Sequence, residues 1–543
     1  MRKTPLMRSA PRGSGLGGVL GVLMLALPAW AELPDYTPQL QARTNLLGND
    51  SGAYNLEPGN LLAGGLQVPL TLDRQLAFRL SITPEGRNAM WWGGDGMGSR
   101  IYLLPVLGED ARASDPGLNS QGDVAFAVTR ASPASSNGIY LFNVSTPGQV
   151  RILRQPAGAS EWSSLWLNEA GQLGFRATFP STGRAYVLLS PRDDGSYALT
   201  YLAKEKGADP ENRYQSLYAP TLNDRGQMAG VGETAASNSE YFQELRVYAP
   251  DGLSSQVVVR SRGLEGSSPV YRFESVQPAL NNRGQVAFLG RVRSGNQNLT
   301  TLWLWTGTEL KVLAQNGQGS IKEIELFPPD MNDSGLVVFR AFDTANLRAV
   351  WVSDGQGLKR VVTEHDILPS DLGPARVDQE TASNPVFSGT PLLNARGDVT
   401  FVAGLTPPEN TQEEWGTAIY VAKSSLPPPG APDGGTDGGS GQTDAGPWDA
   451  GADAGPWDAG PGTEPDSGTD AGSTAPPDAS TDAGSNEPPD AGQTTDAGTG
   501  QEPGKDTSGC GCQSTPTSAA FSGLLLGLAR FLSVRRREGS RRS

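Results

Sequence analysis

One nine-residue pattern recurs along this chain and limits the folds that it can adopt. Its frame is apolar-Asn-x-x-Gly-x-apolar-x-Phe, and it occurs as LNSQGDVAF, LNEAGQLGF, LNDRGQMAG, LNNRGQVAF, MNDSGLVVF and LNARGDVTF. A weaker seventh copy, LTLDRQLAF, has Thr71 and Arg74 in place of Asn and Gly. The asparagine and glycine of the six clear copies are Asn119 and Gly122, Asn168 and Gly171, Asn223 and Gly226, Asn281 and Gly284, Asn332 and Gly335, and Asn394 and Gly397.

The spacing of the copies predicts the architecture. They lie 48 to 62 residues apart, so that seven units nearly fill residues 32–425. The unit around Asn281 reads as four short strands, RFESVQPAL, QVAFLGRV, TTLWLW and ELKVLAQ, with turn residues between them. Four antiparallel strands repeated in tandem are typical of a β-propeller blade. We therefore predict an all-β propeller of seven four-stranded blades. A β-solenoid is the main alternative, but its coils are usually shorter.

The ends of the repeat region differ from its middle. The last unit has two strand-like runs after its Asn-x-x-Gly turn, and Pro427–Pro429 stop it before a fourth strand. The segment from Glu32 to about Pro69 precedes the first unit. We predict that part of this segment pairs with the last sheet and closes the ring, because closure removes an open sheet edge.

The recurring Asn-x-x-Gly is turn chemistry. An Asn side chain can bond the backbone two residues further on, and Gly tolerates the positive φ of a tight turn. The alternative is that the Asn side chains bind a cation or another ligand. Equivalent hairpins explain equivalent turns without a ligand, so we expect these positions to be structural.

The parity of the strands places the longer connections. The first and third connections of each unit are tight, whereas the second connection and the link to the next unit are longer. Strands alternate in direction, so all the long connections should emerge on one face of the propeller. Binding residues favour loops on a rigid scaffold, and this long-loop face is the predicted functional face. The clearest long connections are residues 131–137, 203–215, 234–240, 364–384 and 406–416.

The N-terminal segment, residues 1–31, has the features of a secretory signal. Four basic residues precede an apolar run, and a small-x-small site ends at Ala31, so that cleavage is expected before Glu32. The apolar run is shorter than a membrane span needs. An uncleaved N-terminal anchor is the alternative.

The C-terminal part divides into a linker and a tail. Residues 426–508 are rich in Pro, Gly, Asp and Ala and contain sixteen acidic residues and one lysine, which predicts a disordered spacer. Its two tryptophans, Trp448 and Trp457, are either solvated or a docking point. Residues 509–543 contain Cys510 and Cys512, then an apolar run and an arginine cluster, which predicts a short membrane anchor with its basic end in the cytoplasm.

Two resemblances follow from these motifs. The tail resembles the MYXO-CTERM sorting signals of myxobacterial surface proteins, although Arg530 interrupts the apolar run. That resemblance implies export, cleavage and anchoring through a modified Cys510 or Cys512. The repeats resemble those of choice-of-anchor proteins with tandem NxxGxVAF repeats, as in LNSQGDVAF and LNNRGQVAF. The latter family implies no activity and no site residues.

The segment 32–425 contains few side chains that suggest catalysis. They contain no cysteine, and the only histidine of the chain, His365, lies between two acids in VVTEHD, where a solvated side chain is expected. Asp95, in a Gly-rich run, could bind Ca²⁺ or lie in a flexible second connection of the first unit. The mild acidity of these residues disfavours nucleic-acid binding. We accordingly expect no catalytic, cofactor-binding or metal-binding residues and a protein that is not an enzyme.

These observations predict an exported protein that presents the long-loop face to an extracellular glycan or protein. We expect it to be anchored at the cell surface, at the outer membrane, or released. Two other hypotheses stay open: a polysaccharide-active enzyme that uses loop carboxylates, and a purely structural or adhesive surface protein.

Overall fold

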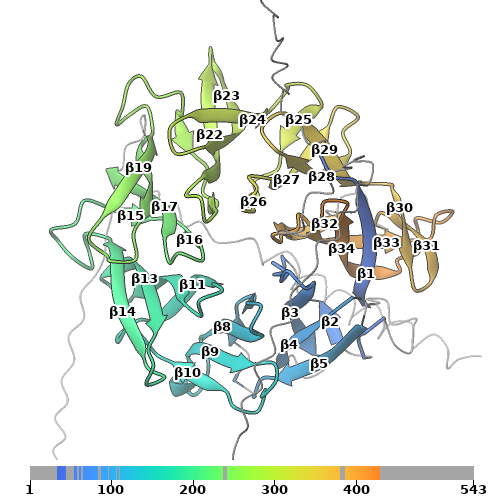
Figure 1. The fold of residues 1–543 in the computed structure, drawn as a ribbon, viewed down its shortest axis with the longest axis horizontal. Coiled ribbons are helices and arrows are strands. Elements are labelled where there is room, and N and C mark those ends of the chain that lie inside the picture. Colours follow the sequence, from blue (N-terminus) through green and yellow to red (C-terminus); the bar gives the residue numbers. More distant parts are fainter. Residues whose placement is uncertain are drawn as a thin grey trace, which may run out of the picture. The chain divides into compact units, whose positions relative to one another are not determined.

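The computed structural model describes residues 33–44, 54–57, 60–62, 65–82, 87–95, 97–105, 107, 108, 110–235, 241–379 and 386–427. In these residues it is an all-β propeller of seven blades around a central axis (Figure 1). The predicted fold class is therefore confirmed. The described residues contain no α-helix, and their one helical turn is the 3₁₀ segment Ala134–Ser136. Within them, no helix has the length and apolar character needed to cross a bilayer.

The first three blades lie between residues 60 and 204. Blade 1 contains β2 (Asn60–Leu62), β3 (Gln75–Ile82), β4 (Arg87–Gly94) and β5 (Met97–Leu103). Blade 2 contains β6 (Arg112–Ala113), β7 (Gly117–Leu118), β8 (Asp123–Thr129), β9 (Gly138–Asn143) and β10 (Arg151–Leu153). Blade 3 contains β11 (Glu161–Leu167), β12 (Leu173–Phe179), β13 (Gly183–Pro191) and β14 (Tyr197–Lys204).

Blades 4 to 6 repeat the arrangement of blade 2. Blade 4 contains β15 (Ser216–Leu217), β16 (Thr221–Leu222), β17 (Met228–Ala235), β18 (Phe242–Tyr248) and β19 (Ser255–Arg260). Blade 5 contains β20 (Arg272–Phe273), β21 (Ala279–Leu280), β22 (Val286–Ser294), β23 (Gln297–Trp305) and β24 (Leu310–Gln315). Blade 6 contains β25 (Ile321–Ile324), β26 (Asp330–Met331), β27 (Val337–Asp343), β28 (Arg348–Ser353) and β29 (Leu358–Thr363).

Blade 7 combines both ends of the repeat region. It contains β32 (Phe387–Leu393), β33 (Val399–Thr406) and β34 (Gly416–Ser424), and its outer strand is β1 (Tyr36–Thr44), which pairs antiparallel with β34. The predicted closure of the ring by the N-terminal segment is therefore confirmed. A hairpin of β30 (Ile367–Ser370) and β31 (Gly373–Val377) joins the end of β33.

Proline explains why the inner strand of most blades is broken into two short pieces. A proline occurs three residues before the repeat asparagine in five blades, and its missing N–H removes one ladder hydrogen bond. In blades 2, 4, 5 and 6 it separates the two pieces of the inner strand, and in blade 7 it coincides with a register shift in β32. These prolines are Pro116, Pro220, Pro278, Pro329 and Pro391.

The aromatic residue that ends each repeat packs between neighbouring blades. Six blades have a phenylalanine at this position, and each of these side chains is at most 3% exposed. They are Phe78, Phe126, Phe175, Phe288, Phe339 and Phe401. In blade 4 this position is Gly230. A Cβ there would lie 2.5 Å from the hydroxyl oxygen of Tyr186, which comes from blade 3 and is fully buried. The neighbouring ring thus fills the space of the missing phenylalanine.

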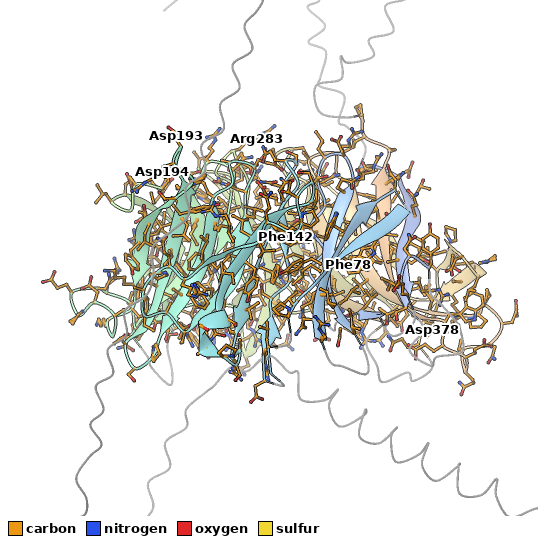
Figure 2. All side chains as sticks on the ribbon, turned by 90° about the horizontal axis from the view of Figure 1, so that it is seen from below. Phe78, Phe142, Asp193, Asp194, Arg283 and Asp378 are labelled. Carbon is orange, nitrogen blue, oxygen red and sulfur yellow. The ribbon has the colours of Figure 1, made fainter. Side chains whose placement is uncertain are left out.

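Strand parity separates the connections between two faces, although the second connections of blades 5 and 6 are no longer than their third connections, contrary to the expectation. Asp193 and Asp194, in the tight turn between β13 and β14, lie on the same face as Arg283 in an Asn-x-x-Gly turn, and Asp378 lies on the opposite face (Figure 2). We call these the tight-turn face and the long-loop face.

One local expectation was wrong. Asp95 does not lie in a second connection, because it forms the tight turn between β4 and β5, the third and fourth strands of blade 1. Its carboxylate accepts a hydrogen bond from Lys423 at 3.2 Å. The predicted long connection over residues 364–384 contains the β30–β31 hairpin.

Candidate functional site

The repeat asparagines link neighbouring blades. The side-chain amide of each donates to the main-chain oxygen of the corresponding asparagine in the next blade, over 3.0 to 3.4 Å. The sixth, Asn394, donates to the main-chain oxygen of Thr71 at 3.1 Å. Thr71 has no amide with which to continue the series to Asn119. We call this series, from Asn119 to Thr71, the asparagine ring.

Each ring asparagine also shapes its own turn. In Asn281, the side-chain oxygen accepts hydrogen bonds from the main-chain N–H groups of Arg283 (3.1 Å) and Gln285 (3.0 Å). Gly284 in that turn has φ +78°. In the seventh copy the same place is held by Arg74 at φ +61°, and its guanidinium binds Asp398 instead. The asparagine oxygens are thus used by the backbone and do not point to a cation.

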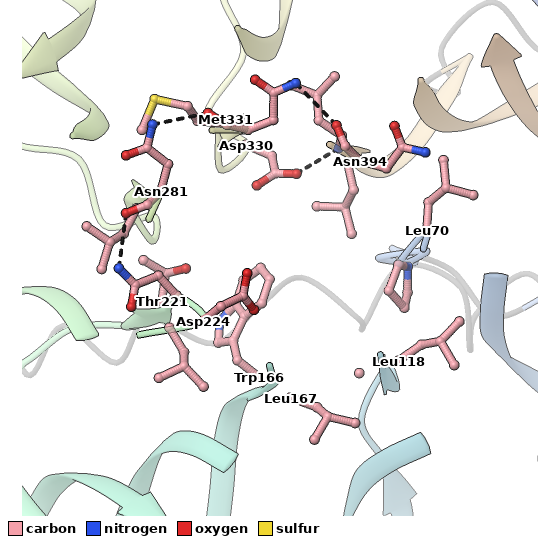
Figure 3. A pocket seen from close by; sticks show the side chains of 18 of the residues that line it. Leu70, Leu118, Trp166, Leu167, Thr221, Asp224, Asn281, Asp330, Met331 and Asn394 are labelled. Atoms are coloured by element: carbon pink, nitrogen blue, oxygen red, sulfur yellow. Dashed lines mark hydrogen bonds between the residues drawn. The ribbon is translucent and has the colours of Figure 1, made fainter. Parts of the chain in front are cut away.

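The turns of the repeat surround a cavity of about 230 Å³ in the centre of the propeller, on the side of the tight-turn face. Figure 3 shows Trp166, Thr221, Asp224 and Asp330 on its wall. The carboxylate of Asp330 accepts a hydrogen bond from the main-chain N–H of Leu393 at 2.7 Å. Burial raises its pKa to about 6, since desolvation disfavours the charged form.

A second group of polar side chains lies at the long-loop ends of blades 4 and 5. Tyr241 and Tyr271 meet edge to face with their ring centres 5.5 Å apart. The guanidinium of Arg272 lies 5.2 Å from the ring centre of Tyr241, and that of Arg293 lies 5.4 Å from the ring centre of Tyr271. With Arg291, these residues form what we call the tyrosine–arginine cluster.

The arginines of this cluster are only partly neutralised. Arg272 and Arg291 pair across strands β20 and β22, and both approach the carboxylate of Glu274, which is 6% exposed. The Nε atom of Arg272 is buried and has no hydrogen-bond partner in the described part of the chain. Arg293 is exposed at the end of β22. The guanidinium of Arg293 is therefore the group of this cluster that is most open to an anionic oxygen from solvent.

Tyr218 extends the cluster toward the inner strand of blade 4. Its hydroxyl donates to the carboxylate of Glu233 at 2.7 Å and accepts from the side-chain amide of Gln243 at 3.2 Å. Burial and the contact with Glu233 raise the pKa of Tyr218, so the phenol keeps its proton at neutral pH. The side-chain oxygen of Gln243 accepts a hydrogen bond from the main-chain N–H of Phe273, and this bond links blade 4 to blade 5.

The sequence did not indicate this cluster. Its residues come from β20, from the end of β22 and from two connections, so no short motif contains them. One signal was present, in that tyrosines and arginines recur in YRF, YFQ and RVR at the predicted long-loop ends. The expected cleavage residues Ala31 and Glu32 and the expected anchor residues Cys510 and Cys512 lie outside the described residues.

His365 does not stand alone as expected. Its Nε2 atom lies 3.4 Å from the Oδ2 atom of Asp378, although the side chain is 41% exposed. Glu364 completes a group of three side chains at the base of the β30–β31 hairpin. The prediction of a merely solvated histidine missed Asp378, which is thirteen residues away in the chain.

Comparison with known proteins gives a family match without a known role. Residues 108–369, from blade 2 to the start of the hairpin, match the model of DUF7453, a family of unknown function. No curated protein sequence matches the chain. Among similar solved structures, a PL25 ulvan lyase is 10% identical, with TM-score 0.38 over 67% of this chain and 95% of that chain. Polysaccharide lyase Uly1 is 8% identical, with TM-score 0.42 over 72% and 99%.

A third similar structure, a puromycin hydrolase mutant, is 14% identical, with TM-score 0.38 over 68% of this chain and 58% of that chain. The expectation that this protein is not an enzyme is contradicted by these neighbours, which are two lyases and a hydrolase. Missing sequence motifs were not a sufficient ground for excluding catalysis, since carboxylates or phenols from separate blades leave no motif. At this similarity the neighbours assign no reaction to the chain.

Proposed function

We propose that the long-loop face binds an acidic extracellular polysaccharide at the tyrosine–arginine cluster. The observation that carries this proposal is the exposed guanidinium of Arg293 against the ring of Tyr271, beside the partly exposed Arg272 and the ring of Tyr241. Guanidinium groups bind carboxylates and sulfates with two parallel hydrogen bonds, and tyrosine rings offer flat apolar faces for sugar C–H groups. An acidic polymer presents both kinds of group at regular spacing.

The cluster is also placed for a long ligand. Its residues lie on the face with the longer connections, where a polymer can extend across several blades. The central cavity is a weaker candidate for such a ligand, because it holds about 230 Å³ and its wall carries Asp224 and Asp330. Two carboxyl groups disfavour an anionic chain by like-charge repulsion.

The proposal is tested by measuring binding of alginate, dextran sulfate and neutral dextran to the full chain. Arg293→Ala removes an exposed guanidinium that stacks on Tyr271 and that forms no ion pair within the described residues. We expect this variant to bind the two acidic polymers at least about tenfold more weakly, from the loss of a charge-assisted contact of about 1.5–3 kcal/mol. Neutral dextran should bind weakly to both proteins.

Arg283→Ala is the matched control, because Arg283 is also an exposed arginine but lies on the tight-turn face (Figure 2). It changes the net charge by the same amount. Equal weakening by both substitutions would show a general charge effect and contradict a site at the cluster. So would unchanged binding in the Arg293 variant.

A second candidate function is cleavage of the bound polymer. It is favoured by the 2.7 Å hydrogen bond from Tyr218 to Glu233, because a phenol paired with a carboxylate can transfer a proton to or from a substrate. Tyr218→Phe should then abolish release of oligosaccharides while leaving polymer binding within about threefold. Binding without any release by the unmodified protein would eliminate this candidate.

We also propose that the protein is exported and held at the cell surface by its C-terminal tail. The support is the signal-like segment before Glu32 and the arrangement of Cys510, Cys512 and the following apolar run. Replacing both cysteines by alanine should release the protein into the medium or leave the tail uncleaved. Unchanged surface localisation of the double variant would contradict the role of these cysteines.

A further inference from the structure

We propose that Glu364, His365 and Asp378 form a binding site for Zn²⁺ at the base of the β30–β31 hairpin. Their possible ligand atoms all lie within 4.8 Å of one another. An imidazole with two carboxylates matches the N and O ligands that zinc takes in proteins, and three protein ligands leave a fourth position for water. His365 is the only histidine in the chain, and it lies in this group.

The hairpin brings the three ligands together. Ile367 pairs with Arg376 in the antiparallel ladder of β30 and β31. Beyond this pair the ladder becomes irregular, and the main-chain N–H of His365 donates to the main-chain oxygen of Val377 at 2.8 Å, which brings His365 beside Asp378. Glu364 and His365 enter the hairpin and Asp378 leaves it, so a bound ion would join its two ends.

The carboxylates are oriented by the backbone around them. A Glu364 oxygen accepts a hydrogen bond from the main-chain N–H of Arg348 at 3.0 Å, and Asp378 Oδ1 accepts one from the N–H of Gln379 at 2.8 Å. Such partners fix ligands before an ion arrives. Arg376 competes for the site, because its Nε donates to Asp378 Oδ2 at 2.9 Å. It is 29% exposed and must turn toward solvent when the ion binds.

The hairpin covers the strand that closes the propeller. Arg43 of β1 is 1% exposed, and its guanidinium binds both oxygens of Asp371 at the hairpin tip, each at 2.9 Å. The hydroxyl of Tyr420, from β34, donates to the main-chain oxygen of Pro369 in the hairpin at 3.1 Å. An ion that fixes the hairpin base therefore stabilises the contact with β1, and Zn²⁺ should stabilise the folded chain by linkage.

The single histidine makes the test direct. The full-length protein is labelled with ¹⁵N-histidine, treated with EDTA, and titrated with Zn²⁺ while the one imidazole is followed by NMR and the unfolding midpoint is recorded. We expect a saturable shift of the imidazole nitrogens and a rise of the midpoint with zinc concentration. A shift caused equally by Ca²⁺, or no saturable shift, would overturn the proposal.

Variants separate the site from general effects. Glu364→Gln should weaken zinc binding at least about tenfold, as loss of a metal-site group does, without changing the midpoint in EDTA by a comparable amount. His365→Asn should abolish the rise of the midpoint with zinc. Glu409→Ala removes an exposed carboxylate from another connection and should bind zinc normally. Undiminished zinc stabilisation in the His365 variant would overturn the assignment, whichever way the other variants behave.

Discussion

Removing one side chain of the asparagine ring should destabilise the whole propeller, and Asn281→Ala tests this. Asn281 is 3% exposed. Its amide donates to the main-chain oxygen of Asn332 at 3.1 Å and to the side-chain oxygen of Gln285 at 2.8 Å. Its oxygen accepts from the N–H groups of Arg283 and Gln285. The substitution therefore removes four hydrogen bonds, one of which joins two blades.

The expected loss of folding stability follows from these four hydrogen bonds. A typical intramolecular hydrogen bond contributes about 0.5–1.5 kcal/mol net, so four bonds correspond to about 2–6 kcal/mol. Water can reach the N–H of Arg283, whose side chain is exposed, and this reduces the loss. We therefore expect the free energy of unfolding to fall by about 2–4 kcal/mol.

Asn281→Asp separates the turn from the link between blades. The carboxylate still accepts from the two N–H groups of the turn, but it faces the main-chain oxygen of Asn332 without a proton to donate. Above pH 6, Asn281→Asp should lower the free energy of unfolding nearly as much as Asn281→Ala. At pH 4 the loss should be smaller, because a protonated carboxylic acid can donate a hydrogen bond to the main-chain oxygen of Asn332. Arg283→Ala, in the same turn but outside the ring, is the control.

Urea unfolding of the full chain, followed by tryptophan fluorescence, gives these differences. A loss below about 0.5 kcal/mol for Asn281→Ala would equal that of an ordinary surface substitution. That result would refute the asparagine ring as a stabilising device. An aspartate variant as stable as the unmodified protein at pH 7 would refute the bond between the blades alone.

Three further outcomes are expected. Thr71→Asn should raise the urea midpoint, because it supplies the amide that could donate to the main-chain oxygen of Asn119 and complete the ring; an unchanged midpoint would contradict this geometry. Deletion of residues 33–44 should lower the unfolding temperature and expose the β34 edge, measured by calorimetry and hydrogen exchange, and unchanged protection of β34 would argue against closure by β1. Burial raises the pKa of Asp330 in the folded protein to about 6, above the ordinary aspartate value of 3.8, so its contribution to stability is lost as pH rises from 3.8 to about 6. Asp330→Asn should remove this fall in stability, which urea midpoints at pH 4 and pH 7.5 measure. A decrease of the variant's midpoint between these pH values as large as that of the unmodified protein would contradict the role of Asp330.

The sequence alone was sufficient for the architecture, and the reason is that its signals are local and periodic. Nearly every copy of the repeat contains its own turn glycine, its own alternating strand and its own aromatic residue for the space between blades; the exceptions are Arg74 and Gly230. A chain that repeats such a unit seven times buries those aromatic residues by stacking the units around an axis. The same regularity predicted that the N-terminal segment would supply the missing strand of blade 7.

The tertiary structure decided everything that joins residues from different repeats. The asparagine ring depends on main-chain oxygens one blade away, Tyr186 fills the space at Gly230 from a neighbouring sheet, and Tyr241 meets Arg272 through side-chain directions that no periodicity encodes. Asp378 reaches His365 only because the intervening residues form a hairpin. Local patterns set the blades, whereas the contacts between blades depend on packing over long sequence separations, which is where the candidate sites lie.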